Sequence, residues 1–183
     1  MIIEDGKGSS VKAEVDANNR LVVKTSKPIA FNSLNSQEAY DFSTSDFISI
    51  TSADTETGIM YLKNNEATKD LFIDSIRTCA NQIHKVILYK NPTGGTLISN
   101  ASTAAATNLN FNSNNTPTAL YYKGAEGYTV TGGSVMSQHI NDVGHSATGY
   151  NDALIIGPGD SIALTFELAA AGDCCVRIIS YFQ

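Results

Sequence analysis

The sequence has 183 residues, a length that suits one domain and is sufficient to bury an apolar core without a disulfide. Its formal charge is −6, its pI is near 4.9 and no run of basic residues occurs, which argues against a nucleic-acid surface. No apolar stretch approaches the ~20 residues of a membrane span, and the first residues lack the apolar core of a signal peptide. We therefore expect no membrane contact, and a chain that matures in a reducing cytoplasm.

The three cysteines are Cys79, Cys174 and Cys175. An odd number with two adjacent members does not match an extracellular disulfide framework, and no Cys-x-x-Cys pair indicates a zinc or redox site. Adjacent residues of a strand point to opposite faces. We therefore predict that one of Cys174 and Cys175 is buried as a small apolar residue and that the other is a free thiol.

Residues 1–15 contain glycines, serines and only isolated apolar residues, so we predict an N-terminal arm there and a single β domain over residues 16–183. A helix over 67–76 is an alternative to a strand over 70–79, but β-branched residues and neighbouring turns favour the strand. The continuous apolar run in 85–90 indicates a strand covered on both faces. In the first half of the chain the sequence predicts strands at 20–25, 47–51, 58–64, 70–79 and 85–90.

The second half contains the clearest strand, which follows the Gly-Pro-Gly-Asp turn at 157–160. Ile162, Leu164, Phe166 and Leu168 alternate with small or polar residues, so the four large side chains share one face. We expect residues 135–150 to form a surface loop and residues 97–117 to be a long connection or an edge excursion. Residues 169–173 have the length of a hairpin loop. Other strands are predicted at 120–123, 128–131, 153–156 and 174–182.

Eight or nine short strands with little room for helix predict an all-β, two-sheet β-sandwich. A jelly roll is the first expectation for its topology and an immunoglobulin-like sandwich the second. The sequence has no internal repeat of the length that would indicate a propeller or a solenoid.

We find no catalytic, cofactor-binding or metal-binding pattern that outweighs an ordinary structural role. His139, Asp142 and His145 have metal-ligand side chains, but nearby glycines argue against the helix that would align them, and solvated loop histidines are the simpler interpretation. The carboxylates lie in or beside predicted turns, and a Gly-x-Ser-x-Gly nucleophile motif is absent. Exposed tyrosines could stack on sugars, although tyrosines in strands more often pack. The four tyrosines considered for this role are Tyr121, Tyr122, Tyr128 and Tyr150.

Five segments in chain order contain a set of turn and strand-end motifs. They are Asp5-Gly6-Lys7-Gly8 with Lys12 to Asp16 and Asn18 to Leu21; Tyr61-Leu62-Lys63-Asn64-Asn65 with Asp70-Leu71; Tyr89 to Thr96 with Ser99-Asn100-Ala101; Tyr122 to Tyr128 with Thr131; and Gly157 to Ile162. Taken together, these segments resemble a family of small virion structural proteins of tailed bacteriophages.

The resemblance implies a non-enzymatic protein without cofactors, located in the virion and assembled in the cytoplasm of the host bacterium. Its implied partners are the major capsid protein or other virion proteins. We expect a decoration (cement) protein on the outside of the head, present as a homo-oligomer and specifically as a trimer. The alternative is a neck, collar or tail accessory protein or a fibre, including one that contacts a receptor or glycan. Candidate subunit or capsid contacts are Asp5, Lys7, Lys12, Asn19, Arg20, Asn91 and Thr93.

Overall fold

The computed structural model describes residues 3–4, 12–15, 21–22 and 37–183. The first three of these segments form a small antiparallel sheet of their own, in which the middle strand pairs with both others. Its strands are β1 (Ile3–Glu4), β2 (Lys12–Val15) and β3 (Leu21–Val22).

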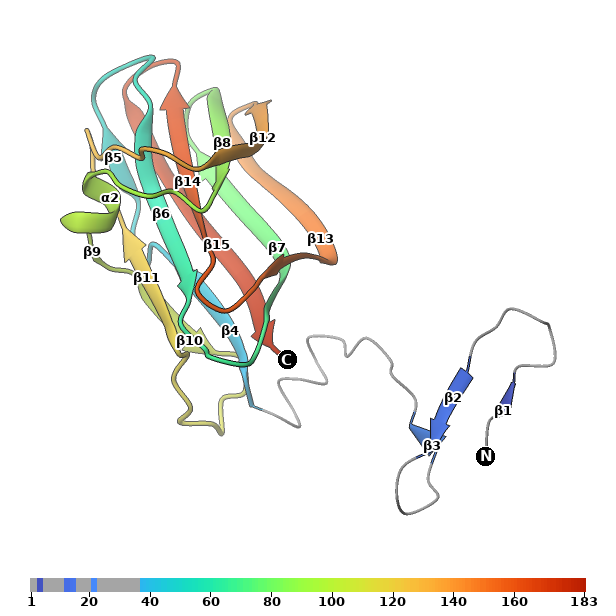
Figure 1. The fold of residues 1–183 in the computed structure, drawn as a ribbon. Coiled ribbons are helices and arrows are strands. Elements are labelled where there is room, and N and C mark those ends of the chain that lie inside the picture. Colours follow the sequence, from blue (N-terminus) through green and yellow to red (C-terminus); the bar gives the residue numbers. More distant parts are fainter. Residues whose placement is uncertain (1–2, 5–11, 16–20, 23–36) are drawn as a thin grey trace.

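Residues 37–183 form an all-β sandwich of two antiparallel sheets, as the sequence predicted (Figure 1). In the β15 sheet the strand order is β10-β4-β15-β7-β13, and β5 also pairs with β15. In the β14 sheet the order is β12-β8-β14-β6-β11-β9. The strands are β4 (Ala39–Ser43), β5 (Ile48–Ile50), β6 (Thr57–Asn64), β7 (Leu71–Ala80), β8 (His84–Lys90), β9 (Ser102–Thr103), β10 (Ala105–Asn108), β11 (Ala119–Lys123), β12 (Ser134–Asn141), β13 (Gly144–Ile156), β14 (Ser161–Leu168) and β15 (Gly172–Phe182).

The order in which the chain visits the two sheets pairs strands from its two ends. Setting aside β5, β9, β10 and β11, the remaining strands pair as β4 with β15, β6 with β14, β7 with β13 and β8 with β12. The first strand of this set therefore lies beside the last, and the second beside the second from last, as in a sheet ribbon rolled up from its ends. The predicted hairpin at 169–173 is wrong, because β14 and β15 belong to different sheets and this segment crosses between them.

The main core lies between the two sheets. Strand β14 contributes its large apolar side chains to this core, as the alternation of its residues predicted. Ile162, Leu164, Phe166 and Leu168 are all buried in one cluster with residues of the facing sheet such as Ile178. Each such side chain contributes about 1.5–3 kcal/mol through the apolar surface that it removes from water. The strand rather than the helix is confirmed for residues 71–80 by its pairing with β13 and β15.

The opposite face of the β14 sheet carries a second, smaller core beneath the short helix α2 (Thr96–Ser99). Leu97 of this helix is fully buried and packs with Tyr61 and Ala163. Beside this core, the backbone at Gly124 lies so close to the backbone at Gly58 that only glycine fits, since a Cβ placed on Gly124 would lie 1.8 Å from the carbonyl oxygen of Gly58. Residues 97–117, predicted as a long connection or an edge excursion, contain most of α2 together with β9 and β10, which are the end strands of the two sheets and correspond to the second alternative.

Cys174 and Cys175 point to opposite faces of β15, as expected, but Cys175 is not a free thiol. It forms a disulfide with Cys79, which is its directly paired residue on β7. Cys174 is buried in the core, and burial, with a smaller effect of Asp173, raises the pKa of its thiol to about 12. The prediction of one buried cysteine is therefore correct, whereas the prediction of a second, free thiol is wrong.

Candidate interaction surface

Strands β12 and β13 form one long side of the sandwich, which we call the open side (residues 134–156). β12 is the last strand of the β14 sheet and β13 the last strand of the β15 sheet, and residues 142–143 join them across the edge (Figure 1). Each of the two strands has a hydrogen-bonded neighbour on one flank only within the described residues. The loop predicted at 135–150 is therefore wrong, because most of that segment is edge strand.

The open side lacks several features by which proteins usually protect a sheet edge, although the register of each edge strand shifts at one irregularity. Residues 134–156 contain no Lys, Arg, Glu or Pro, and Asp142 and Asp152 are their acidic residues. Natural edge strands are commonly short, or carry lysine or proline, because their unpaired backbone groups can otherwise capture another strand. At the opposite edges of the two sheets, β9 has 2 residues and β10 has 4, whereas β12 has 8 and β13 has 13.

Large apolar side chains are concentrated on the open side. Five of the eight exposed large apolar residues found among the described residues lie there, and the other three are scattered at positions 47, 83 and 111. Val135 and Ile140 lie on the outer face of the β14 sheet and Ile155 on the outer face of the β15 sheet, and exposed apolar side chains are frequent in protein–protein contacts. The five residues, with their exposed fractions, are Val135 (55%), Met136 (45%), Ile140 (76%), Val143 (61%) and Ile155 (49%).

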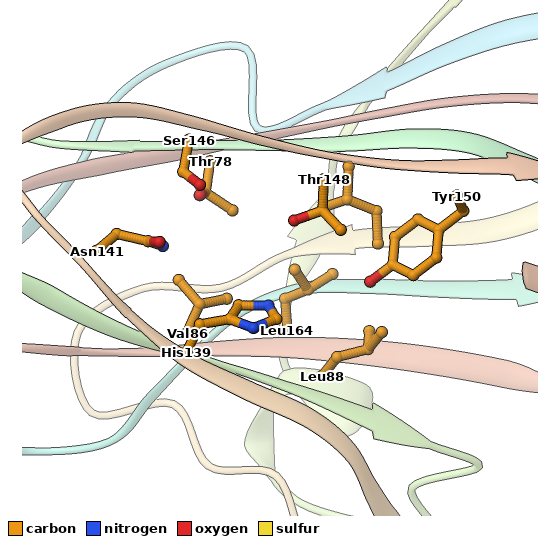
Figure 2. Close-up of a pocket in the computed structure, with 10 residues that line it drawn as sticks. Thr78, Val86, Leu88, His139, Asn141, Ser146, Thr148, Tyr150 and Leu164 are labelled. Carbon is orange, nitrogen blue, oxygen red and sulfur yellow. The ribbon is translucent and has the colours of Figure 1, made fainter.

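Between the two edge strands lies a narrow slot with polar walls (Figure 2). Its apolar floor is formed by Val86, Leu88 and Leu164, which belong to the main core. Its cavity volume is about 10 Å³, which is the space of roughly one water molecule. The slot is therefore too small for a sugar or a cofactor. The polar side chains that line it are Thr78, His139, Asn141, Ser146, Thr148 and Tyr150.

A buried histidine connects β12 to the core at the end of this slot. His84 is 1% exposed, and its ring stacks on Phe166 with a centroid distance of 5.4 Å. Its Nδ1 lies 3.0 Å from the carbonyl oxygen of Gln82, and its Nε2 lies 3.5 Å from Nδ2 of Asn141 on β12. His84 is therefore a structural residue with partners for both ring nitrogens, and it helps to fix the position of β12.

The contact candidates from the sequence lie partly outside the described residues. Asp5, Lys7, Asn19 and Arg20 are not among them, and Lys12 is described only through the backbone pairing of β2 with Glu4 on β1. These five candidates therefore remain predictions.

The two remaining candidates, Asn91 and Thr93, lie in the turn that follows β8. Asn91 Nδ2 donates to Oδ1 of Asp160 at 2.8 Å, and its Oδ1 accepts from the backbone N–H of Ser161 at 2.7 Å. The Asn91 side chain thus ties this turn to the start of β14. Thr93 is exposed, and its backbone N–H donates to the carbonyl oxygen of Thr131. Thr93 therefore has the accessible side chain of the two.

The histidine and tyrosine candidates do not form a common site. His139 faces the slot, whereas His145 is paired with Cys79 across β13 and β7 on the outer face of the β15 sheet. No group of three or more His, Cys, Asp or Glu side chains suited to a metal ion occurs in the described part of the chain.

The four tyrosines considered for sugar stacking are all partly covered. Tyr121 packs against Phe42, and the ring of Tyr122 stacks on Tyr61. The hydroxyl of Tyr128 donates to the carbonyl oxygen of Asn100. Tyr150 lines the slot, and burial raises the pKa of its phenol. These residues therefore do not make up an exposed aromatic platform.

Comparison with known proteins assigns the chain to no family, since neither a protein-family model nor a curated protein matches it. Among the described residues, no helix has the length and apolar character needed to span a membrane. The surface feature that stands out is the open side, with its edge strands that lack Lys, Arg, Glu and Pro and with its exposed apolar side chains.

Proposed function

We propose that this chain is a non-enzymatic structural protein of a tailed-bacteriophage virion, and that it decorates the outside of the head as a cement protein. In this role it binds the major capsid protein as a homo-oligomer and stabilises the shell. The proposal joins the resemblance of the sequence motifs to the geometry of the open side.

The observation that carries the proposal is the presence of two long edge strands without Lys, Arg, Glu or Pro, together with exposed Val135, Ile140 and Val143. Such edges favour strand pairing or apolar contact with another chain. A protein built to assemble keeps these features, whereas a protein that stays monomeric normally removes them. Jelly-roll domains are also a recurrent architecture of viral capsid proteins.

The disulfide between Cys79 and Cys175 supports a location on a particle. Disulfides persist in oxidising surroundings, which include the surfaces of virions, and are rare in the cytoplasm. The two cysteines are directly paired across neighbouring strands, so the fold positions them before they are oxidised. A protein assembled in the host cytoplasm with reduced thiols can therefore acquire this bond after the particle is released.

The test is binding of the purified chain to phage particles that lack it. We expect the full chain to co-sediment with such heads to saturation and to raise their resistance to heat. Deleting residues 1–15 should leave the cooperative unfolding of the sandwich unchanged but weaken binding, because the arm is proposed to order on a neighbouring subunit. Failure of the full chain to bind any particle would refute the structural role, and full affinity of the truncated chain would refute the role of the arm.

The neck, collar or tail position is distinguished from the head by the number of copies per particle. A head decoration repeats with the capsid lattice and is present in hundreds of copies, whereas a neck or tail component follows one axis and is present in about a dozen or fewer. Quantitative mass spectrometry of purified virions measures this number, and a low value would replace the cement role by the accessory role.

A further inference from the structure

We propose that the open side is a self-association surface, on which β12 pairs edge to edge with β12 of a second copy of this chain about a two-fold axis. The inference deepens the assembly role proposed above and rests on it. It concerns the isolated chain, so failure to bind particles and failure to self-associate are separate results.

The absence of charge on β12 is the reason to choose a second copy as the occupant. When identical strands pair about a two-fold axis, the residues near the axis face themselves or close neighbours from the same strand. A Lys, Arg, Glu or Asp in such a strand would be brought close to its own like charge, which destabilises a cross-strand pair. Ser134–Asn141 contains none of these residues. A partner that carried a charged strand would instead be matched by opposite charges on β12.

The regular part of the edge is long enough for such pairing. The register with β8 shifts between Val135 and Ser137, so the strand is bulged around Met136. Residues Ser137 to Asn141 pair without interruption with Leu88 to His84 of β8. A bulge limits the edge at one end, and the turn at 142–143 limits it at the other. Two copies of this segment, run antiparallel, would make a short two-stranded junction that joins the β14 sheets of both chains.

The side chains on the two faces of this segment suit a buried junction. Gln138 pairs with Ile87, and Ile140 pairs with Lys85, which places both β12 side chains on the outer face of the β14 sheet. Ile140 is 76% exposed, so pairing with a second chain would remove much of its apolar surface from water. On the inner face, His139 and Asn141 line the slot, where neutral polar groups can exchange hydrogen bonds with a partner or with water.

The test combines a mass measurement with amide exchange on the full chain. Analytical ultracentrifugation over a wide concentration range should find a monomer–dimer equilibrium for the native sequence. Ile140→Lys should weaken self-association by at least about 100-fold, because the substitution enters the contact twice and places two like charges close to each other beside the two-fold axis. Phe111→Lys is the matched control. Phe111 is 94% exposed and lies beyond β10 at the opposite edge of the sandwich, so this variant should keep the native mass.

Hydrogen–deuterium exchange separates strand pairing from a looser apolar contact. In the native dimer the amides of 137–141 should exchange slowly, and Ile140→Lys should make them exchange quickly while the central strand β14 stays protected. A native chain that is monomeric at every concentration would overturn the proposal, as would an oligomer that Ile140→Lys leaves intact. A trimer, which the sequence resemblance led us to expect, would overturn the two-fold pairing. A monomer that loses only particle binding when Ile140 is replaced would assign the surface to another virion protein.

Discussion

Replacing Cys175 with serine removes the covalent link between β7 and β15 and leaves the rest of the β15 sheet in place. The two cysteines are 96 residues apart in sequence, so the disulfide closes a loop of about half of the chain. In the chain-entropy description, a loop of about 100 residues restricts the unfolded state by about 4.7 kcal/mol, and measured losses usually fall between about 2 and 5 kcal/mol. Cys175 is only partly buried, so the serine hydroxyl adds little desolvation penalty of its own.

The assay is guanidinium unfolding of the native chain and of Cys175→Ser, each with and without a reductant. We expect reductant to lower the stability of the native chain to that of Cys175→Ser, and to leave the variant unchanged. Cys174→Ala is the matched control. It loses the packing of one core sulfur atom but keeps the disulfide, so it should retain the full difference between oxidised and reduced forms.

Thiol titration of the unfolded chain provides the result that would refute this reasoning. The denatured, unreduced native chain should expose one reactive thiol, that of Cys174, and the reduced chain should expose three. Three thiols before reduction, in protein purified from oxidising medium, would mean that β7 and β15 are not held by a disulfide. Equal stability with and without reductant would lead to the same conclusion.

Three further predictions concern the core, a surface carboxylate and a turn. Phe166→Ala should lower the free energy of unfolding by about 3–5 kcal/mol, measured by denaturant unfolding, because it opens a cavity in the main core. Glu126 accepts hydrogen bonds from the Thr51 hydroxyl and from the backbone N–H groups of Thr51 and Ser52, which lowers its pKa from 4.5 to about 2. The contribution of the ionised Glu126 to the free energy of unfolding is therefore complete above pH 4.5 and is lost as the pH falls towards 2. The difference in free energy of unfolding between the native chain and Glu126→Gln should shrink over that range. A difference that stays constant would contradict the assignment. Asn91→Ala should lower the melting temperature more than Thr93→Ala does, since it leaves a part-buried turn without two hydrogen bonds.

The central strands could be predicted from sequence because their residues alternate strongly. In β14, each large apolar residue from Ile162 to Leu168 is followed by a small or polar one, and the large residues are buried together in the main core as this pattern implies. The burial of Ala163 on the other face was not implied by the pattern, because it depends on helix α2. The edge strands could not be predicted in the same way. In β12 and β13 the inward positions are held by residues such as His139, Asn141 and Thr148, so the apolar alternation that identifies a strand is missing.

The candidate surface was missed for the same reason, although one signal for it lies in the sequence. The stretch from 134 to 156 has no Lys, Arg, Glu or Pro yet contains Val135, Ile140 and Val143, which is unusual for a solvated loop. The disulfide was missed because it depends on the register of β7 with β15, which are distant in sequence and become neighbours only through the topology. Whether residues 1–15 act as an arm stays a prediction.

The position of β15 has a consequence for how the protein can be made. Gly172–Phe182 comes after both of its neighbours in the chain, yet it is the strand between β4 and β7, and Gln183 exchanges two backbone hydrogen bonds with Asp70. During synthesis, β4 and β7 therefore emerge before the partner that joins them, and this layer can close only after β15 has left the ribosome. A chain truncated before Gly172 would lack the centre of the layer and not its margin, and would have two unpaired strand edges open to misassembly.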